Sequence, residues 1–185
     1  MGKHVCPWWL GYLLACPLLR FGHNPAVLLA PYVREGMTVL EPGPGMGFFT
    51  LELARLVGSS GRVVAVDMQR KMIEALKRRA GKAGVLARLD ARIVSPDSMR
   101  LHDLAGKVDF TFAFAVVHEL PGAHPFFSEI ALASKPAACL LISEPTGHVN
   151  SRKFEAELQA AAAAGFELAS CPPIRRSRTA LMRKK

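Results

Sequence analysis

Two groups of residues in this sequence have the types and spacing that a binding or catalytic site needs. The first is an acid followed by three glycines at alternate positions, Glu41, Gly43, Gly45 and Gly47. Glycine is needed where a turn takes positive φ, or where the backbone approaches a ligand without a Cβ in the way. The apolar run before Glu41 and the helical pattern after Gly47 predict a strand, a tight turn and a helix. This arrangement indicates a nucleotide-like ligand over the carboxyl end of a parallel strand.

A second acid follows at a spacing typical of ribose binding. The β-branched run over 61–66 ends in Asp67, twenty positions after Gly47. An acid that closes the second strand of such a sheet can accept hydrogen bonds from both ribose hydroxyls. Asp67 can also cap the helix expected over 69–83, and one residue can serve both purposes.

The spacing differs from that of dinucleotide-binding proteins, because Phe48 stands where their fingerprint has its third glycine. The sequence instead resembles the class I S-adenosylmethionine (SAM)-dependent methyltransferases, whose first motif is this acid-x-Gly-x-Gly-x-Gly. The resemblance runs from Thr38 to the C-terminus and is greatest to small single-domain enzymes related to the quinone-biosynthesis C-methyltransferases. It implies methyltransferase activity with SAM as the cofactor.

The resemblance also implies which residues contact the cofactor. Met68 matches a position that packs on the adenine, with core packing as the alternative, and Asp97 matches an adenine-reading acid, with a turn role as the alternative. Ala115 ends the fourth expected strand, where a backbone carbonyl faces the ammonium group of the cofactor. The full set of expected cofactor residues is Glu41, Gly43, Gly45, Gly47, Asp67, Met68, Asp97, Ser98 and Ala115.

Two unusual sequences follow the fourth and fifth expected strands, at the edge where ligands of open α/β sheets bind. The first contains His118 and Glu119, and the second contains Glu144 and His148. Methyl transfer needs a positioned nucleophile and often the removal of its proton, for which histidine is suited near neutral pH. We therefore expect His118, Glu144 and His148 to be catalytic and Glu119 to contact substrate. The alternatives are a packing role for His118 and a turn role for Glu119.

Residues 1–36 precede the first expected strand and are predicted to form a helical cap, or lid, over a SAM-binding core at 37–185. Aromatic side chains in such a lid can line an apolar or cationic substrate, although core packing is the alternative. The lid residues expected to bind substrate are His4, Cys6, Trp8 and Trp9. Together with the acceptor-side residues, His4 and Cys6 also have the types of metal ligands, so a metal or soft-element site is a further alternative. No metal is assigned.

Apolar runs alternate with helical patterns through the rest of the chain. Strands are expected over 38–41, 61–67, 91–94, 108–115, 138–143, 166–169 and 178–182, and helices over 24–34, 48–57, 69–83, 124–133 and 151–164. This alternation predicts an α/β fold, a doubly wound and mostly parallel seven-stranded sheet with helices on both faces. The resemblance implies that the last strand is antiparallel beside the sixth. Residues 1–185 are expected to form a single methyltransferase domain with an extra N-terminal helical segment.

Composition narrows the classes of protein. Half of the 185 residues are apolar, which argues against disorder, and no apolar run is long enough for a membrane span. The four cysteines lack CxxC or zinc-site spacing, which indicates reduced thiols and a cytoplasmic protein. The net charge of +9 and several basic clusters are compatible with nucleic acid, but such clusters are more often solvated faces.

These observations favour a SAM-dependent methyltransferase that acts on a small-molecule acceptor. The sequence after the fourth strand has neither the Asn/Asp-Pro-Pro-Tyr/Phe motif of amino-group methylation nor the Pro-Cys pair of cytosine C5 methylation. Two alternatives stay open: an RNA-modifying methyltransferase of the same fold, and a SAM-binding accessory module without its own activity. The oligomeric state is not predicted.

Overall fold

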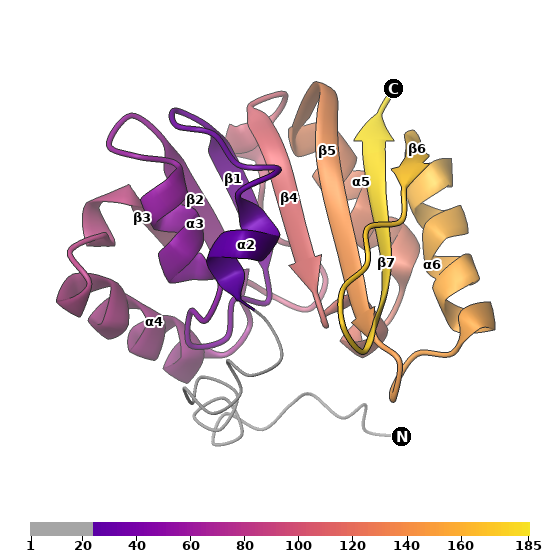
Figure 1. The fold of residues 1–185 in the computed structure, drawn as a ribbon, viewed down its shortest axis with the longest axis horizontal. Coiled ribbons are helices and arrows are strands. Elements are labelled where there is room, and N and C mark those ends of the chain that lie inside the picture. The colour runs from indigo at the N-terminus through magenta and orange to yellow at the C-terminus, as the bar shows by residue number, and fades with distance from the viewer. Residues whose placement is uncertain (1–23) are drawn as a thin grey trace. The chain divides into compact units, whose positions relative to one another are not determined.

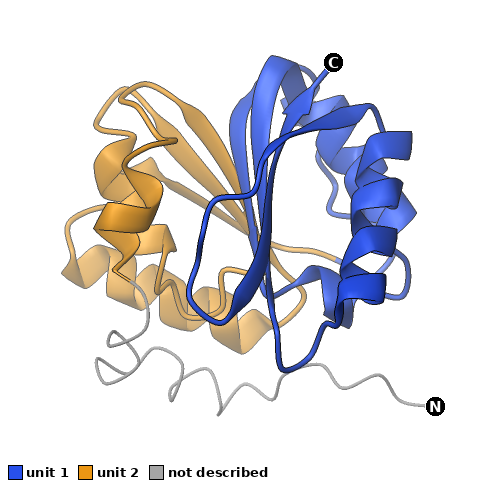
Figure 2. Cartoon of the chain, turned by 45° about the vertical axis from the view of Figure 1, so that its right-hand side comes forward, with its two compact units in different colours: residues 1, 95–185 blue, residues 2–94 orange. Residues whose placement is uncertain are grey.

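The computed structural model describes residues 24–185, and these residues fall into two compact units (Figures 1 and 2). Unit 2, orange in Figure 2, ends at Val94 and is described from residue 24, whereas unit 1, blue, is described as Ser95–Lys185. Each unit is an α/β structure with helices beside its strands (Figure 1). The predicted lid residues His4, Cys6, Trp8 and Trp9 lie outside the described residues.

Unit 2 contains three parallel strands in the order β3-β2-β1. These strands are β1 (Thr38–Pro42), β2 (Arg62–Asp67) and β3 (Leu89–Ile93). Its helices are α2 (Pro25–Leu29), α3 (Thr50–Leu56), α4 (Arg70–Lys82) and the 3-10 helix η2 (Leu86–Arg88). All three strands were predicted, and so were α3 and α4.

The apolar sequence of β2 explains why this strand is buried and why α4 packs against it. Val63, Val64 and Ala65 are fully buried, as expected for a parallel strand that is covered on both faces. Ile73 and Leu76, one helical turn apart on α4, pack against Ala65. This contact seats α4 on the strand that ends at Asp67.

Unit 1 contains four strands in the order β4-β5-β7-β6. They are β4 (Val108–Phe114), β5 (Ser134–Pro145), β6 (Phe166–Ser170) and β7 (Ser177–Lys184). Strands β4 and β5 are parallel, and β7 lies antiparallel to both β5 and β6, which confirms the predicted antiparallel last strand. The helices of unit 1 are α5 (Ala123–Ala133), α6 (Ser151–Ala163) and the 3-10 helices η3 (His102–Leu104) and η4 (Val117–Glu119).

Helix α6 has clear boundary residues. The Asn150 side chain accepts a hydrogen bond from Lys153 N at 2.9 Å, so it caps the first turn. Gly165 takes a φ of 94° just after the last turn, and it ends the helix as the sequence predicts. The buried positions of α6 are Phe154, Glu157 and Ala161, so a carboxyl group lies within the inward stripe of this helix.

Two elements differ from the prediction at their ends. The first described helix, α2, stops at Leu29, because Pro31 lacks the backbone N–H and its ring crowds the preceding turn. The Asn24 side chain caps this helix by accepting from Ala26 N at 3.1 Å. Strand β5 starts at Ser134, earlier than predicted, because Ser134 pairs with Val108 of β4 ahead of the proline-containing segment that hides the strand in the sequence.

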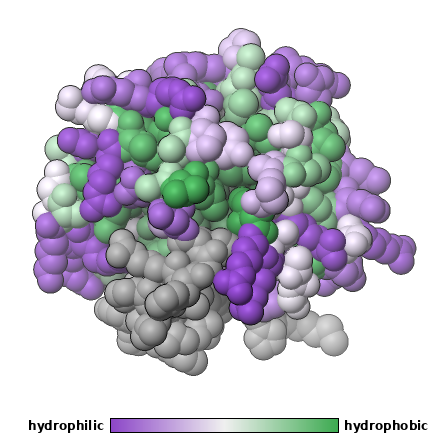
Figure 3. Space-filling model, viewed as in Figure 1, coloured by the Kyte–Doolittle hydropathy of each residue, from purple (hydrophilic) through white to green (hydrophobic). Residues whose placement is uncertain are grey.

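The described surface has hydrophobic side chains that are spread over different elements. The large exposed ones are Val27, Leu86, Ile93, Leu132 and Leu168, each on a different helix or strand. Hydrophilic residues dominate the margins of the face in Figure 3. Isolated apolar side chains of this kind are normal for a protein surface. Within residues 24–185 there is no helix that combines the length and apolar character of a membrane span.

Candidate cofactor and acceptor sites

The glycine turn that follows β1 in unit 2 has the backbone shape that its sequence predicts. Gly43, Gly45 and Gly47 take φ values of 69°, 53° and 86°, in the left-handed region that favours glycine. A Cβ at Gly45 would meet no atom within 4 Å, so the turn is open on that side. A Cβ at Gly47 would overlap the Leu76 side chain of α4. Gly45 therefore suits close approach of a ligand, whereas Gly47 allows helix packing.

Glu41, near the end of β1, is a buried acid with an unpartnered oxygen. The residue is 4% exposed, and its Oε2 has no hydrogen-bond partner among the described residues. Burial raises the pKa of Glu41 to about 8, the side chain of Thr50 acts against this rise, and the charge of Asp67 acts in its direction. A buried polar atom without a partner indicates a missing donor. The ammonium group of a ligand would be such a donor.

Asp67 ends β2 and is tied to the start of α4. Its Oδ1 accepts a hydrogen bond from Gln69 N at 2.8 Å, and Gln69, not Asp67, is the N-cap residue of that helix. Burial raises the pKa of Asp67, while hydrogen bonds from the backbone of Gln69, Gly45 and Met68 oppose the rise. The Gly45 backbone thus links Asp67 to the glycine turn, and Met68 lies half-buried beside it.

The residues of unit 2 fit SAM by their chemistry. An unpartnered carboxyl oxygen on Glu41 suits an ammonium group, and Asp67 at a strand end suits ribose hydroxyls. The open side of Gly45 leaves room for the ligand next to the backbone. Their roles as cofactor contacts stay predictions.

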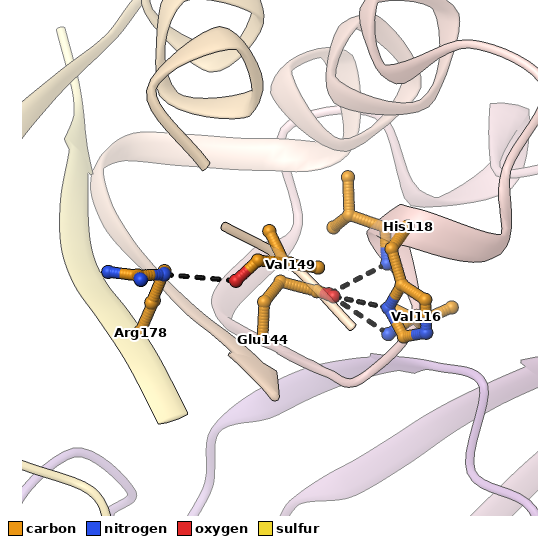
Figure 4. Close-up of polar contacts among 6 residues, drawn as sticks. Val116, His118, Glu144, Val149 and Arg178 are labelled. Atoms are coloured by element: carbon orange, nitrogen blue, oxygen red, sulfur yellow. Dashed lines mark hydrogen bonds and ion pairs between the residues drawn. The ribbon is translucent and has the colours of Figure 1, made fainter. Parts of the chain in front are cut away.

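Glu144 is the centre of the predicted catalytic group in unit 1. It lies near the end of β5 and is fully buried. Its Oε1 accepts hydrogen bonds from Val116 N at 3.1 Å and Val117 N at 2.9 Å, and its Oε2 faces Nδ1 of His118 (Figure 4). Backbone and imidazole donors together satisfy this buried acid, as a buried charge requires.

His118 is held in one orientation by this contact. Because Glu144 accepts from two backbone N–H groups through its other oxygen, we assign the His118 Nδ1–H as the donor to Oε2 of Glu144. The hydrogen bond from Glu144 raises the pKa of His118, burial lowers it, and the charges of Glu144, Glu119 and Glu157 raise it again. No residue in the described part of the chain hydrogen-bonds the His118 Nε2, and the side chain is 18% exposed. This nitrogen can therefore face a substrate.

His148 completes the predicted group at the surface. Its ring lies edge-on to that of His118, with 5.4 Å between the ring centroids, and the residue is exposed. The Arg178 Nε donates to the carbonyl of Val149 at 3.0 Å, which holds the segment next to His148 (Figure 4). The structure thus brings His118, Glu144 and His148 together, and Glu119 lies beside them in η4. Their roles as catalytic or substrate residues stay predictions.

The chain reverses after β4 through a strained residue. Ala115 takes a φ of 54°, which is rare for a residue with a Cβ, and its N–H donates to Ser143 O at 2.8 Å. This turn is followed by the Val116 and Val117 N–H groups that Glu144 binds. Strain of this kind is found at functional sites. The predicted cofactor contact of Ala115 belongs to this turn.

The loop that contains Asp97 and Ser98 is fixed by an acid on α5. Glu129 accepts hydrogen bonds from Met99 N at 3.0 Å and from the Ser98 hydroxyl at 3.2 Å. Asp97 is exposed at the tip of this loop. The hydroxyl of Ser98 is engaged, and so is its backbone, whose N–H donates to Ser95 O at 3.4 Å and whose carbonyl accepts from the Ser95 hydroxyl at 3.4 Å. The adenine contact at Ser98 stays a prediction.

Two residues of these sites were not predicted. Glu129 supports the loop at Ser98, and Glu157 is a buried acid whose pKa is affected by the charges of Glu144 and His118. A sequence signal exists for Glu157, since its helical spacing to Phe154 and Ala161 places an acid in an apolar stripe. Within residues 24–185, no group of three or more His, Cys, Asp or Glu side chains is arranged to hold a metal ion.

Comparison with known proteins gives the family. Residues 33–177 match the family described as methyltransferase domain. The chain belongs to the SAM-dependent methyltransferases. SAM is the cofactor of this family, and the predicted family and cofactor are confirmed.

A solved structure confirms the fold class for this methyltransferase. A SAM-dependent methyltransferase from Aquifex aeolicus is 26% identical, with a TM-score of 0.84 over 97% of this chain and 98% of that chain. A TehB-like SAM-dependent methyltransferase from Corynebacterium glutamicum has a TM-score of 0.72 over 91% of this chain and 93% of that one, at 18% identity. The similarity to the C. glutamicum structure concerns the fold alone.

Curated relatives of the methyltransferase differ in their acceptors. Demethylmenaquinone methyltransferase of Staphylococcus aureus is 28% identical over 62% of this chain and 46% of its own length. Ribosomal RNA small subunit methyltransferase A of Magnetococcus marinus is 28% identical over 70% of this chain and 51% of its own length. The chain thus spans about half the length of these relatives, and their names include both a quinone and an RNA acceptor.

Proposed function

We propose that this chain transfers the methyl group of SAM to a small-molecule acceptor and that His118 removes the proton of the acceptor. The observation that carries the proposal is the hydrogen bond between the His118 Nδ1–H and the buried Glu144. This bond fixes the imidazole tautomer that leaves Nε2 as an acceptor for a proton. SAM, when bound, supplies a methyl group activated by its sulfonium.

The Glu144–His118 pair resembles the orienting half of a catalytic triad. Glu144 holds the ring and stabilises the imidazolium that forms when Nε2 takes up a proton. The carboxylate itself is held by two backbone N–H groups, so its position does not depend on the histidine alone. His148, exposed and edge-on to the His118 ring, is suited to contact the acceptor at the surface.

The residues of unit 2 take the cofactor role in this proposal. Glu41, once ionised, pairs with the amino group of the ligand through its unpartnered Oε2. Asp67 accepts hydrogen bonds from the ribose, and Gly45 gives the ligand access to the backbone.

Charge near His118 supports a small acceptor over a nucleic acid. Three acids, Glu119, Glu144 and Glu157, contribute to the electrostatics of this histidine. A phosphate backbone is bound by lysine and arginine, and acids at the same place would repel it. The quinone acceptor in the name of the S. aureus relative is also a small molecule.

An RNA acceptor is the second candidate. It is favoured by the net charge of +9 and by the ribosomal RNA methyltransferase that matches 70% of this chain. A third hypothesis is a SAM-binding accessory module, which would bind SAM without transferring its methyl group.

The test is a transfer assay with methyl-labelled SAM and a panel of acceptors. The panel contains a soluble demethylmenaquinone analogue, other small phenols, thiols and amines, and small-subunit ribosomal RNA. We expect label in a small molecule, with no label after His118→Asn. Label in RNA alone would replace the proposal with the second candidate, and tight SAM binding without any transfer would favour the accessory module.

A further inference from the structure

Arg79 joins helix α4 to the glycine turn that follows β1 in unit 2. It lies in the last turn of α4, where a cation interacts favourably with the helix dipole. Its Nη1, however, donates a hydrogen bond to the carbonyl of Met46 at 2.5 Å, and 33 positions separate the two residues in the sequence. The half-buried Arg79 therefore binds the backbone of the predicted cofactor turn directly.

The apolar face of α4 that packs against the turn also presents Arg79 to it. Met72 and Ala75 pack with the buried side chain of Met46. Arg79 lies seven positions after Met72 and four after Ala75, so the three residues share one face of the helix. A Cβ at Gly47 would overlap a further side chain of this helix. The turn is thus held against α4 by both its backbone and its side chains.

The carbonyl that Arg79 binds belongs to a peptide unit that is held on both sides. The N–H of the same unit is that of Gly47, and it donates to Pro44 O at 2.9 Å. The carbonyl of Pro44 shares a peptide unit with the Gly45 N–H. Burial raises the pKa of Asp67, and a hydrogen bond from the Gly45 backbone opposes this rise. Hydrogen bonds therefore run from the guanidinium on α4, through two peptide units of the turn, to the predicted ribose-binding acid.

A turn of this composition needs restraint from outside. Gly43, Gly45 and Gly47 all take positive φ, and glycine loses more conformational freedom than any other residue when it is ordered. Hydrogen bonds that form a chain also strengthen one another. A turn that is already ordered lowers the entropy cost of binding a ligand at the open side of Gly45.

We propose that Arg79 is a positioning residue for cofactor binding, which holds the glycine turn in the shape that lets SAM approach Gly45. The inference rests on the part of the proposed function that places SAM at Glu41, Gly45 and Asp67. Arg79 does not contact SAM in this account. It acts through the Met46 carbonyl, so its loss changes the turn before any ligand is bound.

The test measures SAM affinity by calorimetry and the amide signals of the turn by NMR, both on the full chain. Arg79→Met removes the donor but continues the apolar face of α4, so its melting temperature should stay close to the wild-type value. We expect this variant to bind SAM roughly 5- to 10-fold more weakly, the worth of one hydrogen bond. Without ligand, its Gly45 and Gly47 amide signals should move. Arg78→Met is the matched control, since it removes the same charge from an exposed position of the same helix and should change neither quantity.

Two further variants separate the donor from the fold. Arg79→Gln removes the charge and shortens the side chain, and it should weaken SAM binding as Arg79→Met does. Arg79→Lys keeps a charged donor and should recover part of the affinity.

Wild-type SAM affinity in Arg79→Met and Arg79→Gln, or unmoved amide signals of the turn, would overturn the inference. An affinity of Arg79→Lys no higher than that of Arg79→Met would overturn it as well. A wild-type chain that does not bind SAM would instead overturn the proposed cofactor site, and the inference with it.

Discussion

At the scale of single residues, the account depends on what Glu144 does to His118. Glu144 binds the Nδ1–H of His118 and raises the pKa of the imidazole above its ordinary value of 6.5. A general base must be neutral to act, so the protonated form of His118 is inactive in this role. The structure therefore predicts an acidic limb in the pH profile that lies above pH 6.5.

We expect His118→Asn to lower turnover by about 100-fold or more, which is the usual contribution of a general base. SAM affinity should change little, because the predicted cofactor residues in unit 2 are left intact. Glu144→Gln should move the acidic limb to lower pH, since the acid that favours the imidazolium is lost. The measurement is the pH dependence of turnover with the acceptor found in the panel, and an unchanged limb in Glu144→Gln would contradict the pairing.

Sequence alone could identify some of these residues and not others. Glu41, Gly45 and Asp67 could be proposed from the sequence because their spacing is local, with a turn between a strand and a helix. Glu157 was not predicted because an acid on a helix is usually solvated. Its position in an apolar stripe was the available clue.

At the scale of elements, a prediction concerns three glycines, of which Gly45 and Gly47 lie in the turn after β1 and Gly84 lies just after α4. Gly45, Gly47 and Gly84 all have positive φ, so alanine should cost about 1–2 kcal/mol of unfolding free energy at each. Gly47→Ala should cost roughly 1–3 kcal/mol more, because its Cβ would overlap the Leu76 side chain. Gly45→Ala alone should combine a small stability loss with weaker SAM binding.

Gly84→Ala is the matched control for Gly45→Ala. A Cβ at Gly84 also meets no atom within 4 Å, so the two variants carry the same backbone strain in open surroundings. Denaturant unfolding and calorimetric titration with SAM separate the two effects. Equal SAM affinity in both variants would argue against close approach of the cofactor at Gly45.

The elements themselves were largely predictable because their ends carry local signals. Asn150 and Gly165 mark the two ends of α6 in both sequence and structure. The errors arose where a distant strand decides the boundary, as when Ser134 pairs with Val108 ahead of the expected start of β5. Pro31 is the opposite case, because this local breaker ends α2 within a longer helical sequence pattern.

At the scale of the whole molecule, two buried acids predict how stability depends on pH. Burial raises the pKa of Glu41 to about 8 and that of Glu157 to about 7, from 4.5. The folded state thus holds these protons more tightly than the unfolded chain. The stability that they contribute is fully present below pH 4.5 and is lost as the pH rises through about 7 and about 8.

We therefore expect Glu41→Gln combined with Glu157→Gln to flatten the loss of stability between about pH 5 and pH 8. The exposed pair Glu74→Gln and Glu155→Gln removes the same number of charges and should leave the slope unchanged. Thermal unfolding across a buffer series gives the comparison. Parallel curves for the wild type and the buried double variant would contradict the prediction.

The fold class and the cofactor were predictable for the whole chain because one motif, Glu41 to Gly47, with Asp67 after it, identifies the family. The acceptor was not, because the proposed acceptor site combines side chains from η4 and β5 that are distant in sequence and meet in the folded unit 1. The names of two relatives accordingly include different acceptors, a quinone and an RNA.

The most direct test of the account is a calorimetric titration of the full chain with SAM, S-adenosylhomocysteine and NAD. We expect both adenosyl ligands to bind and NAD to bind much more weakly. Asp67→Ala should weaken SAM binding by about 1.5–3 kcal/mol, the worth of hydrogen bonds to a charged acceptor, while the exposed control Glu74→Ala should not. Tighter binding of NAD than of SAM, or an Asp67→Ala variant with wild-type affinity, would contradict the account.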